Sequence, residues 1–319
     1  MIIDSHVHLF GPGYFPPAWH QHTARRWAKA VVPPRDPNDI LPHIERGLVD
    51  PDGSILMEEF DRAGVDAGIC LTLDWGWAIG DTSGASPEEM MRHYGDLQEK
   101  LHGRFFAVAN VDPRRPGALE LYEQAIKEWG LKGFKVYPPV GLYPYDEAYF
   151  PFYEKSLELG VPVYIHTAME PSYPLNARFA NPLGVGDVQV RYPDLTIILA
   201  HSGYPKWGEE AIEVAHNHPD TYMELSNWNF VAKKDPGKVV RFIAEMRDKM
   251  GAHRILFGSD HLGGPRFSGE KSILPDWVSF VSGLANEAPK FGCEFTQDEI
   301  GLIMGGNAQR LFGIPERPR

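Results

Sequence analysis

The stretch MIIDSHVHLF (1–10) places two histidines one residue apart at the end of a short apolar run. Because side chains alternate across a strand, His6 and His8 point to the same side. Two further HxH pairs, at 20–22 and 216–218, lie in an irregular polar stretch and at a helix end, where residues i and i+2 do not share a face. Only the first pair therefore predicts two neighbouring imidazoles at the end of a buried strand.

Seven more apolar, β-branched runs follow the run at 2–8, at 67–73, 105–111, 133–138, 161–167, 195–201, 221–226 and 255–260. Most are continuously apolar, which is typical of parallel strands covered on both faces. Stretches with apolar residues at helical spacing fill most gaps, at 54–64, 86–102, 116–129, 148–159, 206–217 and 236–250. Eight strands alternating with helices predict a (β/α)8 TIM barrel. The alternative is a doubly wound open sheet, but no glycine-rich phosphate loop follows the first strand.

The 319 residues are predicted to form one domain over 1–319, because no repeat or linker divides the chain. Two segments exceed what a minimal barrel needs: 9–53, which is rich in proline and aromatic residues, and 261–295. Both follow strand ends, at the rim where barrel active sites are built. We therefore expect a distorted barrel with long lid loops after strands one and eight.

The composition is that of a soluble globular protein, with 43% apolar and 23% charged residues. A net charge of −12 without a basic cluster argues against nucleic acid or an anionic membrane as a partner. No apolar run approaches the ~20 residues that cross a bilayer, and no signal peptide is visible. With only two cysteines, Cys70 and Cys293, we expect a reducing, cytoplasmic location. Assembly into a homo-oligomer stays open.

Side chains that bind metals end three other predicted strands. Strand five ends in His166, strand six in His201 and strand eight in Asp260. The carboxyl ends of barrel strands meet at one rim, so these residues should converge with His6 and His8. Imidazole and carboxylate groups together suit Zn²⁺, Mn²⁺ or Fe²⁺. The sequence therefore predicts a divalent-metal site, with zinc as the first expectation and one or two ions per chain.

Lys135 lies in the fourth predicted strand, within GFKVYP (133–138). A buried lysine is costly unless it is paired, neutral or modified. One interpretation is an ammonium group that reaches the rim and pairs with a carboxylate such as Asp260. The other is a lysine that has reacted with CO₂ and bridges two metals. Asp4, which has the parity of His6, either orients a metal ligand or is a buried hydrogen-bonding residue.

The motifs DSHVH, GFKVYPP, PVYIHTA, ILAHSG, LFGSDHLGG and NAQRLFGI occur in this order over nearly the whole chain. In these motifs the sequence resembles the amidohydrolase superfamily, specifically its amidohydrolase 2 family, which includes members similar to aminocarboxymuconate-semialdehyde decarboxylase. The resemblance implies a distorted TIM barrel with a mononuclear or binuclear metal centre. It implies that His6, His8, His166 and Asp260 bind the first metal. His201 would bind a second metal or act as a catalytic acid or base above the metal-bound water.

The family contains hydrolases of C–N or C–O bonds and non-oxidative decarboxylases, and the same residues serve either reaction. Resorcylate decarboxylases typically begin with a glutamate where this chain has His6, and the aminocarboxymuconate type is not expected to carry the lysine of strand four. His6 and Lys135 therefore favour a hydrolase of an amide, ester or lactone, with a decarboxylase of an aromatic or enol carboxylic acid as the alternative. In the hydrolase, Asp260 would move the proton of the metal-activated water to the leaving group, and His201 would stabilise the oxyanion.

Aromatic residues and arginines near strand ends indicate the kind of substrate. Trp75 follows strand two, Tyr137 lies beside the strand-four lysine, and Trp228 follows strand seven. Such residues suit a planar small molecule, although ordinary packing of the rim explains them equally well. Arg178 or Arg266 could bind a substrate carboxylate, although the sequence favours a surface arginine as the interpretation of each alone. Two rival functions are a metal-binding barrel without activity and a metal-free lactonase.

Overall fold

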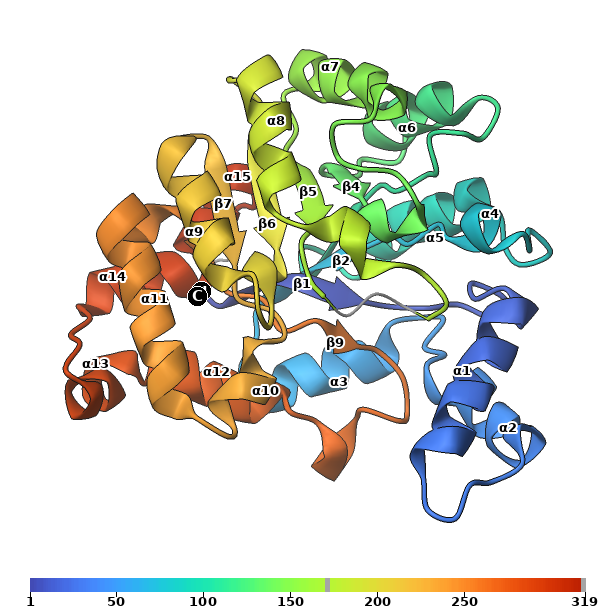
Figure 1. Ribbon diagram of the computed structural model, residues 1–319, viewed down its shortest axis with the longest axis horizontal. Helices are drawn as coiled ribbons and strands as arrows, with labels where there is room; N and C mark the ends of the chain where they lie inside the picture. The colour runs from blue at the N-terminus through green and yellow to red at the C-terminus, as the bar shows by residue number, and fades with distance from the viewer. Residues whose placement is uncertain (170–172, 317–319) are drawn as a thin grey trace.

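The computed structural model describes residues 1–169 and 173–316. Parallel strands form its centre and helices surround them, as Figure 1 shows. The strands are β1 (Ile3–His8), β2 (Ala67–Leu71), β3 (Phe105–Val108), β4 (Phe134–Val136), β5 (Val163–His166), β6 (Ile197–Ala200), β7 (Thr221–Glu224), β8 (Ile255–Leu256) and β9 (His261–Leu262). The predicted α/β TIM barrel is confirmed. The prediction of one domain over 1–319 includes 170–172 and 317–319, which lie outside the described residues.

The strands pair in two sheets, which two seams join. One sheet has the order β3–β2–β1–β9, and the other runs from β4 to β8 in chain order. At the first seam, Ala109 forms a parallel bridge with Phe134. At the second seam, the backbone N–H of Ser5 donates to the carbonyl of Phe257 at 2.9 Å. The second seam is distorted, because β8 is only two residues long and β9 pairs with β1 in its place.

Alternate residues of each strand face two different cores. Tyr164 of β5 belongs to the core inside the barrel, where its ring stacks on Phe312 at 5.9 Å between centroids. Its neighbours Val163 and Ile165 pack outward against the helices. His166 lies two residues after Tyr164 and therefore faces the barrel axis at its carboxyl end.

A β-bulge between Asp4 and Val7 sets the direction of His6 and His8. In this interval β1 has one residue more than β2. Ile3, before the bulge, belongs to the inner core, whereas Val7, after it, belongs to the outer core. The two histidines flank Val7 and therefore point into the mouth of the barrel.

Helices cover the outside of the barrel in chain order. The covering helices are α3 (Ser54–Ala63), α5 (Pro87–Lys100), α6 (Ala118–Lys127), α7 (Phe150–Leu159), α8 (Leu183–Arg191), α9 (Gly208–Asn217), α11 (Pro236–Met250) and α12 (Leu274–Ser282). Shorter helices are α4 (Gly76–Ile79), α10 (Trp228–Ala232), α13 (Leu284–Glu287), α14 (Gln297–Gly301) and α15 (Asn307–Phe312). All six predicted helices are present, whereas the sequence predicts no helix at α8 or α12. None of the described helices has the length and apolar character needed to cross a bilayer.

The segment 9–53 is not the long loop that the sequence predicts. It contains α1 (Pro17–Ala30) and α2 (Pro37–Gly47), which pack side by side at one edge of the molecule (Figure 1). Each helix has a proline in its first turn, where the backbone N–H has no partner in the helix. The prolines from which the sequence predicts a loop therefore stand at the beginnings of two helices. The other predicted loop, 261–295, contains β9, α12 and α13.

Candidate metal centre

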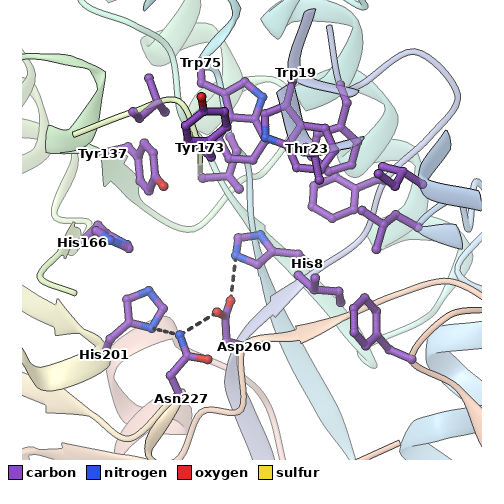
Figure 2. Close-up of a pocket in the computed structure, with 18 of the residues that line it drawn as sticks. His8, Trp19, Thr23, Trp75, Tyr137, His166, Tyr173, His201, Asn227 and Asp260 are labelled. Atoms are coloured by element: carbon purple, nitrogen blue, oxygen red, sulfur yellow. Dashed lines mark hydrogen bonds and ion pairs between the residues drawn. The ribbon is translucent and has the colours of Figure 1, made fainter. Parts of the chain in front are cut away.

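The residues that end the barrel strands line one cavity at its mouth. The cavity has a volume of about 490 Å³. All of the predicted metal ligands line it: His6, His8, Lys135, His166, His201 and Asp260. Figure 2 shows four of them, His8, His166, His201 and Asp260, around a common space. The strands of the barrel thus bring together side chains that lie up to 254 positions apart in the sequence.

The rings of His6 and His8 present bare nitrogen atoms to each other. Nδ1 of His8 lies 2.8 Å from the carbonyl oxygen of Leu71, which can only accept, so this Nδ1 carries the proton. Nδ1 of His6 donates in the same way to the carboxylate of Glu224 at 2.9 Å. Each ring therefore keeps a lone pair on Nε2, and the two Nε2 atoms lie 3.2 Å apart.

Asp260 adds a third acceptor to this pair. Its Oδ1 lies 3.1 Å from Nε2 of His8 and 3.4 Å from Nε2 of His6. The amide of Asn227 donates to its Oδ2 at 2.9 Å, as the dashed line in Figure 2 marks. Burial by itself would raise the pKa of Asp260, but the polar surroundings at the mouth of the barrel, which include the hydrogen bond from Asn227, lower it to about 2. Asp260 is therefore an ionised carboxylate.

The three acceptors, Nε2 of His6, Nε2 of His8 and Oδ1 of Asp260, do not share a proton between them. Burial lowers the pKa of His6 well below its ordinary value, although the charge of Asp260 opposes the shift. The donor atoms of His6, His8 and Asp260 lie within 4.8 Å of one another, and so do those of His6, His201 and Glu224. Imidazoles and carboxylates at this spacing are a donor set that fits a divalent cation.

Glu224 is not among the residues predicted from the sequence, yet it connects the histidines. Its carboxylate accepts from the backbone N–H of His201 at 3.1 Å and from the hydroxyl of Ser226 at 2.7 Å, in addition to His6. Burial raises the pKa of Glu224 to about 7, although the hydrogen bonds from Ser226 and His201 oppose the shift. A signal was available, because Glu224 ends a strand just as His166 does.

The tautomer of His201 follows from Ser226. The hydroxyl of Ser226 has one proton, which it donates to the carboxylate of Glu224. Nδ1 of His201 lies 2.6 Å from the same hydroxyl oxygen and therefore donates to it. The amide nitrogen of Asn227, at 3.2 Å, is the more distant neighbour of this Nδ1. Nε2 of His201 thus carries a lone pair that can bind a metal or accept a proton.

Residues in left-handed backbone conformation mark the turns after β6, β7 and β8. The φ angle is 69° at His201, 46° at Ser202, 67° at Asn227 and 58° at Asp260. Among the described non-glycine residues with positive φ, only His102 lies elsewhere. Such conformations cost about 1–3 kcal/mol each and cluster at functional sites. The strain in this chain is thus concentrated at the mouth of the barrel.

His166 and Lys135 each present a buried polar atom that has no hydrogen-bond partner among the described residues. The atoms are Nε2 of His166 and Nζ of Lys135. Burial lowers the pKa of Lys135 to about 8, although the charges of Glu224 and Asp260 oppose the shift. The charge of Asp260 acts on the pKa of Lys135, but the two side chains form no ion pair. Unpartnered buried polar atoms are rare, and their position here fits a site that binds an ion or a polar ligand.

The residues predicted to bind substrate fall into two groups. Trp75 and Tyr137 line the cavity, with their ring centroids 6.0 Å apart. Trp228 and Arg178 are not among the residues that line it. The indole N–H of the buried Trp228 donates to the carbonyl of His201 at 2.9 Å, so Trp228 supports the turn that carries this histidine. The guanidinium of Arg178 packs on a neighbouring phenylalanine ring.

Aromatic rings of segment 9–53 extend the wall of the cavity that Trp75 forms. The ring centroids of Phe15 and Trp19 lie 4.1 Å apart, and the planes of Trp19 and Trp75 differ by only 7°. Figure 2 shows Trp19 and Trp75 on the side of the cavity opposite His201 and Asp260. This flat, stacked wall suits a planar ligand.

Asp4 contacts the backbone rather than a histidine ring. It accepts hydrogen bonds from the backbone N–H of His6 at 3.1 Å and from the N–H of Ser259 at 3.0 Å. The hydroxyl of Ser259 donates to it at 2.5 Å. Burial raises the pKa of Asp4 to about 8, against these hydrogen bonds. The structure therefore favours the second interpretation of Asp4, a buried residue that ties β1 to the turn before Asp260.

A model of the amidohydrolase family named Amidohydro_2 matches residues 79–314. The chain belongs to this amidohydrolase family. The resemblance that the motifs indicate is thereby confirmed. No curated protein matches the sequence of this amidohydrolase.

Solved structures with the same fold cover nearly the whole amidohydrolase chain. A 5-carboxyvanillate decarboxylase from Novosphingobium aromaticivorans, complexed with manganese and 4-hydroxy-3-methoxy-5-nitrobenzoic acid, has a TM-score of 0.67 at 16% identity, over 98% of this chain and 96% of that one. A 2,6-dihydroxybenzoate decarboxylase complexed with 2,6-dihydroxybenzoate has a TM-score of 0.63 at 17% identity, over 98% and 100%. A probable 2-pyrone-4,6-dicarboxylic acid hydrolase from Acinetobacter baumannii has a TM-score of 0.61 at 14% identity, over 98% and 99%. At these identities the likeness shows the fold alone.

Proposed function

We propose that this amidohydrolase is a metal-dependent hydrolase of C–N or C–O bonds in a small amide, ester or lactone. The observation that carries the proposal is the convergence of three acceptors, Nε2 of His6, Nε2 of His8 and Oδ1 of Asp260. Three acceptors without protons at this spacing fit a divalent cation. One of them, the ionised carboxylate of Asp260, can also take a proton from water.

The roles of the side chains follow from which of their polar atoms have a lone pair or a proton available to a ligand. A divalent ion held by His6, His8, His166 and Asp260 would supply an acidic water molecule and polarise a substrate carbonyl. Asp260 would serve as the base that takes a proton from the attacking water and as the acid that returns it to the leaving group. The unpartnered Nζ of Lys135 donates to the developing oxyanion. Nε2 of His201, with its lone pair, would accept the remaining hydroxyl proton of the tetrahedral intermediate as the product carboxylate forms.

The identity and number of the metal ions form a finer part of the proposal. Zinc is the first expectation, because three imidazoles and one carboxylate are typical zinc ligands. Manganese and iron suit the same donors. A second ion would require Lys135 in its carboxylated form, with His201 as the further ligand. In that case His201 would stabilise the oxyanion through the second ion.

One observation favours a second candidate, a non-oxidative decarboxylase of an aromatic or enol carboxylic acid. The stacked wall of Phe15, Trp19 and Trp75 would hold a flat ring against the histidines. Two of the similar structures are named as decarboxylases of aromatic acids. In this reaction a protonated His201 would deliver its proton to the ring carbon as CO₂ departs.

The experiment that tests the proposal is a paired activity screen. Protein loaded with zinc or manganese is assayed against aryl esters, lactones and anilides, and in parallel against hydroxybenzoates with CO₂ detection. We expect hydrolysis that disappears when the metal is removed by a chelator and returns when it is added back. Release of CO₂ without hydrolysis would overturn the hydrolase in favour of the second candidate. Hydrolysis that survives removal of the metal would favour the metal-free lactonase. The cytoplasmic location and a homo-oligomeric state remain predictions.

A further inference from the structure

Arg266 lies in the wall of the same cavity, in the part built by α1 and α2. It follows β9, and its backbone N–H donates to the carbonyl of Gly47 at the end of α2 at 2.9 Å. Its guanidinium carbon lies 3.4 Å from the ring centroid of Trp27 in α1. The stack fixes the plane of the guanidinium group, and no other described residue accepts a hydrogen bond from the N–H donors at its edge.

No carboxylate of the described residues pairs with this guanidinium group. Burial lowers the pKa of Arg266, and no acidic group in the described part of the chain offsets the effect. The buried Arg254 is different, because its guanidinium donates to several backbone carbonyls, including that of Ala215 at 2.8 Å. Arg254 thus has the contacts of a structural arginine, whereas Arg266 has donors that face a cavity and have no hydrogen-bond partner among residues 1–169 and 173–316.

The predicted metal ligands and Arg266 belong to different parts of one cavity. The ligands come from the ends of barrel strands such as β1 and β5, whereas Arg266 rests on the helices of segment 9–53. A cavity of about 490 Å³ lies within the range of small-molecule sites and is large enough for more than the reacting group. A ligand that fills it can contact both ends.

We infer that Arg266, stacked on Trp27, determines specificity by binding a carboxylate of the substrate at the end of the cavity away from the metal ligands. The inference rests on the proposed function and narrows its substrate class. The substrate is a planar molecule with its reacting group at one end and a carboxylate at the other. A planar guanidinium group matches a carboxylate through two parallel N–H donations, which gives geometric selectivity as well as charge.

The test uses metal-chelating probes that the enzyme does not need to turn over. Benzohydroxamic acids carry at the para position a carboxylate on zero, one or two methylene groups, and each has a matched carboxamide. Their dissociation constants are measured by calorimetry with the manganese-loaded protein. For at least one linker length we expect the carboxylate to bind about tenfold more tightly than its carboxamide, since hydrogen bonds to charged groups are the stronger ones.

Variants separate binding by Arg266 from a structural role. In Arg266→Met, which keeps an apolar side chain against Trp27, the preference for carboxylate should fall to about onefold, and in Arg266→Lys it should fall in part. Arg191→Met is the matched control, because Arg191 also stacks on a ring, that of Phe150, but outside the cavity. It should keep the full preference. Metal content and thermal melting of each variant show whether the fold and the metal site survive.

The outcomes distinguish this inference from the proposed function. If unsubstituted benzohydroxamic acid binds but no linker length gives a carboxylate preference, the inference fails and the metal site stands. A preference that persists in Arg266→Met and disappears in Arg26→Met, a change at the exposed arginine of the same cavity, would also overturn the assignment. If the unsubstituted probe does not bind the metal-loaded protein, the proposed function fails and the inference with it.

Discussion

The Nε2 atoms of His6 and His8 lie 3.2 Å apart, and neither carries the proton that would make this a hydrogen bond. The protons lie on the opposite sides of the rings, where Leu71 and Glu224 accept them. Partners that fix a histidine tautomer in this way also orient the ring toward a metal. The consequences can be tested residue by residue.

Glu224→Gln should weaken metal binding by about 10–100-fold, because the variant loses the carboxylate that fixes the tautomer of His6. The measurement is a competition titration of the apo-protein with a chromophoric chelator. Glu213→Gln is the control, since Glu213 pairs with Lys249 at the surface. Equal affinities of wild type and Glu224→Gln would show that Glu224 has no part in the site.

Asp260→Asn should lower kcat by about 10²–10⁴-fold, because the amide keeps the shape of the side chain but cannot accept a proton. Steady-state kinetics on the best ester or lactone of the screen give this value. Asp276→Asn, on the exposed face of α12, should be unchanged. Full activity of Asp260→Asn, with its metal retained, would contradict the role of this carboxylate.

Trp228→Phe should lower kcat about tenfold or more and leave KM nearly unchanged, because Trp228 supports the carbonyl of His201 rather than lining the cavity. Trp129→Phe serves as the control, because the ring of Trp129 packs under Arg92 of α5. A rise in KM without a fall in kcat would instead support the direct contact with substrate that the sequence predicts for Trp228.

Lys135→Met should stabilise the metal-free protein, because it removes a buried amine that has no partner among the described residues. The pKa of Lys135 is lowered from 10.5 to about 8 in the folded protein, so the unfolded chain binds the proton more tightly. Wild-type stability therefore rises with pH between about 8 and 10.5, and the advantage of the variant shrinks over the same window. Urea unfolding of both apo-proteins at several pH values tests this. An advantage that is constant or grows with pH would contradict it.

Much of the barrel and of the candidate site could be predicted because both depend on local patterns. Each buried strand is a short apolar run, and His166 directly follows such a run, whereas Asp260 follows one after Gly258 and Ser259. In a parallel barrel all strand ends meet at one rim, so position in a strand is enough to predict that these residues gather.

The remaining features depend on contacts that no local pattern reveals. Glu224 ends β7 as His166 ends β5, which is a signal of position, but its contact with His6 appears only when β1 and β7 lie in one barrel. The bulge in β1 is defined by pairing with β2. The stack of Arg266 on Trp27 joins segments that are more than two hundred positions apart in the sequence.

The most direct measurement is the metal content per chain of wild type and of His8→Ala, after both are loaded with zinc or manganese and dialysed. Elemental analysis should find at least one ion per wild-type chain and a large loss in His8→Ala, with the far-ultraviolet circular dichroism unchanged. Two ions per wild-type chain would further support a carboxylated Lys135. A wild-type protein that retains no metal, or a His8→Ala protein that retains as much as wild type, would contradict a metal centre built on His6, His8 and Asp260.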